Sequence, residues 1–119
     1  MPASYKNLLI WQKSMQLATE IYTLFDKMPH CERYALIDQM RRSAISIPSN
    51  IAEGQGRGSD KDFAKFLFIA RGSLYELETQ IELCRILNYF TPSDINSITA
   101  LMTEIAKMLN TILKKIAVD

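Results

Sequence analysis

Apolar side chains recur at steps of three and four residues along almost the whole chain, which is the spacing of one face of an α-helix. Strand signals are nearly absent, because no Asn-Gly or Asp-Gly turn separates two alternating runs. The pattern predicts four helices, which start after Ser4, near Glu32, after Ser59 and after Thr91. Short connections make consecutive helices antiparallel, so we expect one all-α domain over residues 1–119, an up-down-up-down four-helix bundle.

The first predicted helix ends before Pro29 and carries two apolar stripes. The first stripe repeats at coiled-coil-like spacing and is expected to be the seam of the bundle: Leu8, Trp11, Met15, Ala18, Tyr22 and Phe25. The second lies roughly 110° away around the helix at ~100° per residue: Ile10, Leu17, Ile21, Leu24 and Met28. The helix is therefore apolar over a wider arc than a single core needs.

The second predicted helix contains a proline inside its apolar pattern. Its apolar face repeats at steps of four, three and four: Met40, Ala44, Ile47 and Ile51. Pro48 has no N–H to donate to the carbonyl of Ala44, and its ring presses on that carbonyl. We therefore expect the helix to kink or restart at Pro48 and to run out into Gly54, Gly56 and Gly58.

The third predicted helix begins with Ser59 as N-cap and Asp62 three residues on, an arrangement typical of a capping box. Its seam is Phe63, Leu67, Ala70, Leu74, Leu77, Ile81 and Cys84. A second apolar stripe lies well away from that seam and passes beside Gly72: Phe68, Tyr75 and Ile86. Asn88 is expected to close the helix in the left-handed conformation.

The start of the fourth predicted helix is indicated by three residues: Thr91 is the expected N-cap, Pro92 stands at the first helical position, and Asp94 completes a capping box. Its apolar face repeats without a break: Ile95, Ile98, Met102, Ile105, Leu109, Ile112 and Ile116. The opposite face is uniformly polar: Asn96, Thr103, Lys107, Asn110, Thr111 and Lys114. This helix needs only one apolar partner surface.

Composition and charge narrow the class of protein further. The chain has a formal net charge of +1, which does not by itself announce a nucleic-acid partner. No apolar run approaches the roughly 20 residues needed to cross a bilayer, and the N-terminus lacks the layout of a signal peptide, so a cytoplasmic location is expected. Cys31 and Cys84 are too few for a disulfide framework or a zinc site.

Two blocks of the second helix resemble a known signature. Gln39–Arg42 reads QMRR, and residues 46–57 read SIPSNIAEGQGR. Together with the region from Phe63 to Glu78, Leu87-Asn88-Tyr89 and Trp11-Gln12-Lys13, they are similar to the 23S rRNA intervening-sequence proteins. The resemblance implies a four-helix bundle that assembles as a ring-shaped homopentamer. It also implies kinship with the accessory variability protein of diversity-generating retroelements, a basic pentamer that binds nucleic acid; the family offers no catalytic residues to carry over.

The apolar side chains in excess of one stripe per helix are candidates for an oligomer interface. Exposed apolar patches of such size usually mark contacts between proteins. We assign this interface to Ile10, Leu17, Ile45, Phe68 and Tyr75, on the first three helices. The fourth helix is expected to turn its polar face outward.

Basic side chains are expected to gather at one end of the bundle, because the connection between the second and third helices shares an end with both termini. They are Arg57, Lys61, Lys65, Lys114 and Lys115, with Lys6 beside them and Glu53, Asp60, Asp62 and Asp119 as acidic neighbours. A ring of parallel copies would join these ends into a positive rim that contacts the phosphates of RNA or DNA. The alternative is that turns and termini are simply solvated by charged residues.

Candidate catalytic chemistry is sparse. The one histidine, His30, follows a proline in a connection, so no serine or cysteine nucleophile can be paired with a base. Glu76, Glu78 and Glu82 lack the Glu-x-x-His pairs that carboxylate metal sites in bundles use. GQGRGS matches neither glycine-rich phosphate motif. We expect no enzyme activity, cofactor, metal ion or small-molecule substrate.

The expected function is that of a non-catalytic, oligomeric scaffold or adaptor, with weak, sequence-independent binding of nucleic acid. The alternative is a ribonuclease or toxin-like enzyme built on a helical bundle. A convergent acid–base pair would discriminate the two, and the sequence shows none.

Overall fold

The computed structural model describes residues 4–117, which form four α-helices and three short 3₁₀-helices. The α-helices are α1 (Leu9–Leu24), α2 (Leu36–Gly56), α3 (Asp60–Ile86) and α4 (Pro92–Ile116). The 3₁₀-helices are η1 (Tyr5–Asn7), η2 (Phe25–Lys27) and η3 (His30–Glu32). No strand occurs within these described residues, which confirms the all-α prediction.

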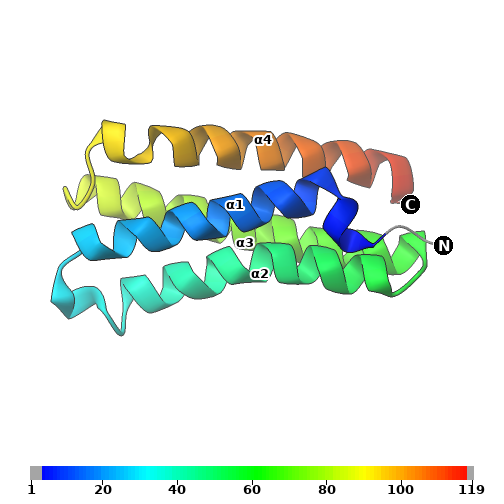
Figure 1. Cartoon of the computed structure of the whole chain (residues 1–119), viewed down its shortest axis with the longest axis horizontal. Helices are drawn as coiled ribbons and strands as arrows, with labels where there is room; N and C mark the ends of the chain where they lie inside the picture. Colours follow the sequence, from blue (N-terminus) through cyan, green and yellow to red (C-terminus); the bar gives the residue numbers. More distant parts are fainter. Residues whose placement is uncertain (1–3, 118–119) are drawn as a thin grey trace.

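The four helices run antiparallel to their neighbours in the chain and form a closed bundle (Figure 1). α1 packs against α2 and α4, and α3 packs against the same two helices, so each helix has two neighbours. The α2–α3 pair shares the most extensive contact. The molecule measures 45 × 24 × 22 Å, and its length is that of its longest helices. The α2–α3 turn lies at the same end as η1 and the end of α4, as predicted (Figure 1).

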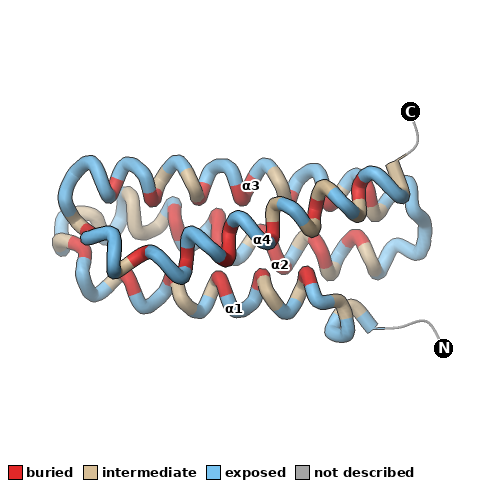
Figure 2. The backbone as a smooth tube through the Cα atoms, turned by 90° about the horizontal axis from the view of Figure 1, so that it is seen from above, coloured by how far each residue is buried: buried red, intermediate tan, exposed pale blue. Residues whose placement is uncertain are grey.

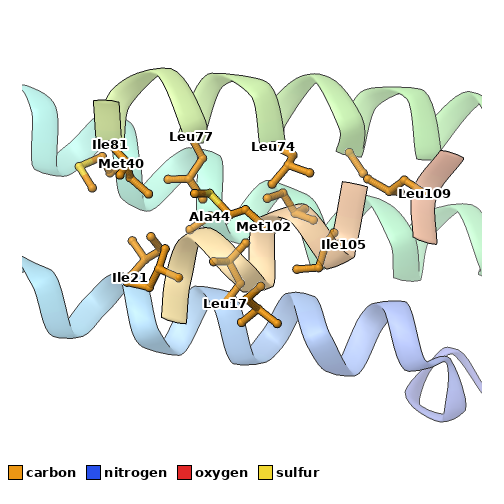
Figure 3. Close-up of a cluster of buried hydrophobic side chains, with 14 of the residues drawn as sticks. Leu17, Ile21, Met40, Ala44, Leu74, Leu77, Ile81, Met102, Ile105 and Leu109 are labelled. Atoms are coloured by element: carbon orange, nitrogen blue, oxygen red, sulfur yellow. The ribbon is translucent and has the colours of Figure 1, made fainter. Parts of the chain in front are cut away.

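One row of aliphatic side chains from each helix fills the centre of the bundle. Figure 2 shows the buried positions recurring on the inward side of every helix. In the close-up, side chains from all four helices point toward one another (Figure 3), including Leu17, Ala44, Leu74 and Ile105, which have no exposed surface. Burial of these rows supplies the main stabilisation, since each fully buried Leu or Ile side chain contributes about 1.5–3 kcal/mol.

The buried stripe of α1 is the opposite of the one predicted. Ile10 and Leu17 are 1% and 0% exposed, whereas Met15 and Tyr22 of the expected seam are 43% and 45% exposed. The prediction of Ile10 and Leu17 as oligomer-interface residues is therefore wrong, because side chains inside one protomer cannot contact another. The stripe with Met15 and Tyr22 lies along the border of the bundle.

Helix α2 continues across Pro48 without interruption, so the predicted restart does not occur. The proline ring is buried, and the expected kink stays a prediction. The beginnings of the first two helices also differ from expectation. Ser4 caps η1 through the backbone N–H of Lys6, so α1 itself begins without a side-chain cap, and α2 begins four residues after Glu32 because η3 and a turn intervene.

The predicted N-caps Ser59 and Thr91 and the predicted left-handed Asn88 are confirmed, whereas the reciprocal capping box predicted at both starts is present at Thr91 and not at Ser59. The Ser59 hydroxyl accepts a hydrogen bond from the backbone N–H of Asp62 at the start of α3. Thr91 and Asp94 form the reciprocal capping box at the start of α4. Asn88 has φ 63°, the left-handed conformation that ends a helix.

Candidate interaction surfaces

Four lysines stand exposed at the end of the bundle that carries the α2–α3 turn. Lys61 and Lys65 project from the first turns of α3, and Lys114 and Lys115 from the last turn of α4. Among residues 4–117, no ion pair involves any of these four. The fold therefore brings the predicted lysines to one end and leaves their charges facing solvent.

Arg57 differs from these lysines because the protein already holds its guanidinium group. Its Nη2 atom lies 2.9 Å from Oε1 of Glu53, and its guanidinium carbon lies 5.0 Å from the centre of the Phe66 ring. Binding of an external phosphate would have to compete with this carboxylate. We therefore rank Arg57 below the four lysines as a phosphate contact.

The two ends of the bundle differ in charge. The end with the α2–α3 turn carries six described cationic side chains and three carboxylates. The cations are Lys6, Arg57, Lys61, Lys65, Lys114 and Lys115, and the carboxylates are Glu53, Asp60 and Asp62. The predicted fourth carboxylate, Asp119, lies outside the described residues. The other end carries three cations, Lys27, Arg33 and Arg85, and five carboxylates, Asp26, Glu32, Glu78, Glu82 and Asp94. The molecule is thus polar along its long axis.

The first apolar surface lies on the outward side of α3 and we call it the α3 surface. It consists of five side chains that are 44–61% exposed: Phe68, Ile69, Tyr75, Leu83 and Ile86. The Arg71 guanidinium lies 4.9 Å from the centre of the Phe68 ring and donates a hydrogen bond to Asn110 of α4. One face of that ring is thereby covered from within the protein, while the remainder of the side chain faces solvent.

The second apolar surface, the α1/α2 surface, consists of Met15 and Tyr22 on α1 and Ile45 on α2, which are 43–45% exposed. Lys13 and Glu20 of α1 contact Glu104 and Ser97 of α4, respectively. Met15 and Tyr22 lie about half a turn away from these contacts on the helix, so they border α2 and not α4.

Of the predicted interface residues, Ile45, Phe68 and Tyr75 are exposed, whereas Ile10 and Leu17 belong to the core. Sequence reasoning missed Ile69 and Leu83 on α3. Ile69 and Leu83 are two heptads apart and therefore lie on the same face of the helix, and this spacing could have identified them as part of one apolar stripe.

The signature SIPSNIAEG is explained by packing of α2 within the bundle. The Ser46 hydroxyl lies 2.7 Å from the Ser73 hydroxyl of α3, and the Asn50 amide donates to the Ser46 carbonyl at 2.8 Å. A Cβ atom on Gly54 would lie 2.7 Å from Cβ of Phe66, so only glycine permits this approach of α2 to α3. These residues position helices and expose no reactive group.

Two ionisable groups outside the basic end, Cys84 and Tyr89, have raised pKa values for structural reasons. Burial raises the pKa of the Cys84 thiol to about 11, which keeps it protonated and unreactive. The Tyr89 hydroxyl donates to Oε2 of Glu32 at 2.8 Å, and this hydrogen bond raises the pKa of Tyr89 to about 12. Within residues 4–117, no three His, Cys, Asp or Glu side chains come together as metal ligands.

The closed ring of four antiparallel helices around an aliphatic core defines a four-helix bundle protein. The model of the 23S rRNA-intervening sequence protein family matches residues 6–111, and the chain belongs to that family. Its structure is similar to the crystal structure of a protein of unknown function from the S23 ribosomal protein family of Bacteroides thetaiotaomicron VPI-5482. The two chains are 32% identical with a TM-score of 0.81, over 89% of this chain and 99% of the other.

A search of curated proteins found no match. None of the helices in the described part of the chain is long and apolar enough to span a bilayer.

Proposed function

We propose that this chain is a non-catalytic scaffold or adaptor that works as a homo-oligomer and contacts nucleic acid weakly through its basic end. The observation that carries the proposal is the pair of exposed apolar surfaces, on α3 and on α1/α2, which the bundle itself does not use. Apolar surface arranged in patches usually marks an interface. The number of copies, five, is taken from the resemblance to the family.

The nucleic-acid part of the proposal is supported by the four lysines at one end, which form no ion pair within residues 4–117. Contacts from lysine to phosphate carry no sequence information, and each one releases counterions. In an oligomer of parallel copies, these ends would add into one positive rim. We include a cytoplasmic location, because the described cysteines, Cys31 and Cys84, are both free thiols.

The oligomer is tested by light scattering coupled to size-exclusion chromatography at micromolar concentration. A single species of several times the mass of 13.6 kDa supports the proposal. A monomer would contradict it.

Nucleic-acid contact is tested with a labelled single-stranded RNA of mixed sequence. We expect a shifted, intact band whose affinity falls about tenfold or more between 50 and 200 mM salt. The triple substitution Lys61→Gln, Lys65→Gln and Lys114→Gln should weaken binding and flatten the salt dependence, whereas Lys13→Gln, on α1 away from the basic end, serves as the control. Cleaved RNA would instead support the ribonuclease alternative.

A further inference from the structure

Gly72 lies at the middle of the exposed face of α3, and no contact within the described residues requires a glycine there. Gly72 lies well inside a 27-residue helix, where glycine costs about 1 kcal/mol relative to alanine. A Cβ atom placed on Gly72 would meet nothing within 4 Å, in contrast to the crowded position of Gly54. Gly56 is also open, but it ends α2, where glycine is ordinary. The helix thus loses stability at Gly72 for no internal gain.

The residues around Gly72 form a second helical stripe on the outside of the bundle. Steps of four, three, four, four and three residues connect Phe68, Gly72, Tyr75, Thr79, Leu83 and Ile86. This is the spacing at which one helix packs along another. The missing side chain of Gly72 leaves a shallow depression that Tyr75, Glu76, Thr79 and Gln80 border. A glycine in such a stripe lets a second backbone approach closely.

The charges beside the depression at Gly72 and beside Ile45 are opposite. Glu76 and Glu78 flank the α3 surface, and neither takes part in an ion pair with another residue in 4–117. Arg41 and Arg42 flank Ile45 of the α1/α2 surface and share the single carboxylate of Asp38. Two guanidinium groups on one carboxylate leave an excess positive charge there. At the depression itself, the charge of Glu76 is thus opposite in sign to the excess positive charge beside Ile45, whereas Lys65 and Arg71 lie toward the Phe68 end of the stripe. Both surfaces are alike in apolar character.

From this we infer that the depression at Gly72 receives the α1/α2 surface of a second copy of this chain. The inference rests on the proposed homo-oligomer and names the two faces that meet in it. Because the two faces differ, the contact is heterologous, and each copy uses both faces at once. Met15, Tyr22 and Ile45 supply the apolar side chains that cover Phe68 and Tyr75, with the arginines facing Glu76.

Two single variants, mixed together, test this pairing. Gly72→Leu fills the depression of the α3 surface, and Ile45→Asp places a charge in the α1/α2 surface. Each variant alone is expected to dissociate to a monomer, with a dissociation constant raised at least tenfold, which is about 1.4 kcal/mol. An equimolar mixture is expected to form a one-to-one dimer, because each chain contributes its intact surface to the other.

Ala100→Leu places the same leucine side chain on the exposed side of α4 and serves as the control, with wild-type mass expected. Circular dichroism checks that each variant stays helical, and Thr79→Arg, in the same stripe, replaces Gly72→Leu if that variant misfolds. Wild-type assembly of both α3 variants would overturn the inference while leaving the oligomer standing. Assembly of Ile45→Asp alone, or a mixture that stays monomeric, would overturn the pairing of the two faces. A monomeric wild type would overturn both this inference and the proposed function.

Discussion

Helices α3 and α4 are nearly equal in length and in their buried rows, but their outward faces differ completely. Both are capped at the start and both bury an unbroken aliphatic row. Within Pro92–Ile116, no large apolar side chain is exposed, whereas α3 exposes five. The two neighbours of α4, which are α1 and α3, cover its large apolar side chains. Of these two helices, only α3 therefore exposes apolar surface on a side that contacts no other helix of the bundle.

The largest expected effect concerns the buried faces of α3 and α4, which are alike. Leu74→Ala in α3 and Leu109→Ala in α4 each remove a side chain with no exposed surface. We expect each to lower the free energy of unfolding by about 2–5 kcal/mol, because a cavity adds to the lost burial. Urea unfolding at one fixed protein concentration measures both. A loss below about 1 kcal/mol at Leu74 would show that the α3 row is less important than its burial indicates.

A smaller effect on stability is expected at the N-terminal caps of α3 and α4, which differ in their hydrogen bonds. Thr91 and Asp94 of α4 exchange two hydrogen bonds, with Thr91 N–H to Asp94 Oδ2 at 2.9 Å. Ser59 caps α3 by accepting from the N–H of Asp62 at 3.2 Å. Asp94→Ala removes the acceptor of the Thr91 backbone N–H and should therefore cost about 1 kcal/mol, whereas Asp62→Ala removes only an acceptor of the Ser59 hydroxyl and should cost less. Thermal unfolding of the two variants decides this, and an equal or reversed order would contradict it.

The smallest effect concerns pH and has opposite signs on the two helices. Hydrogen bonds from the backbone and hydroxyl of Thr91, with Lys27 nearby, hold the pKa of Asp94 below its usual value. Its contribution to stability is present above the unfolded pKa of about 4 and is lost as the pH falls through the lower folded pKa. Asp94→Asn should thus lower the melting temperature at neutral pH and converge with wild type in acid.

Glu78 of α3 behaves in the reverse sense, because burial raises its pKa. Its ionised form is disfavoured in the folded protein, and this penalty disappears as the pH falls from above the folded pKa toward about 4.3. Glu78→Gln should slightly raise the melting temperature at neutral pH, with the gain fading in acid. A gain that grows in acid would contradict the assignment.

The parts of the fold that depend on local chemistry could be predicted from the sequence. The caps at Ser59 and Thr91 and the left-handed Asn88 depend on residues within one or two turns, so their signals are self-contained. The choice between the two stripes of α1 could not be made this way, because it depends on where α2 and α4 lie. The aliphatic character of the Ile10–Leu17 stripe, against Trp and Tyr with polar tips in the other, was the signal that could have decided it.

The candidate surfaces were predictable to a similar degree. Antiparallel order alone brings Lys61 and Lys65 to the same end as Lys114 and Lys115. The pairing of Arg57 with Glu53 and Phe66 depends on side-chain geometry at the α2–α3 turn, which spacing does not reveal. The open position of Gly72 likewise needed the structure, since a glycine in a sequence gives no sign of whether a neighbour crowds it.

The sequential pairing of the helices has a consequence for how the chain folds. α1 packs on α2, α2 on α3 and α3 on α4, so most contacts join residues close in the chain. Proteins with such local contacts fold in microseconds to milliseconds. The α1–α4 seam, with Lys13 against Glu104 and Glu20 against Ser97, joins the most distant parts and has the largest loop to close. We expect the α2–α3 hairpin to form early in folding and this seam to close last.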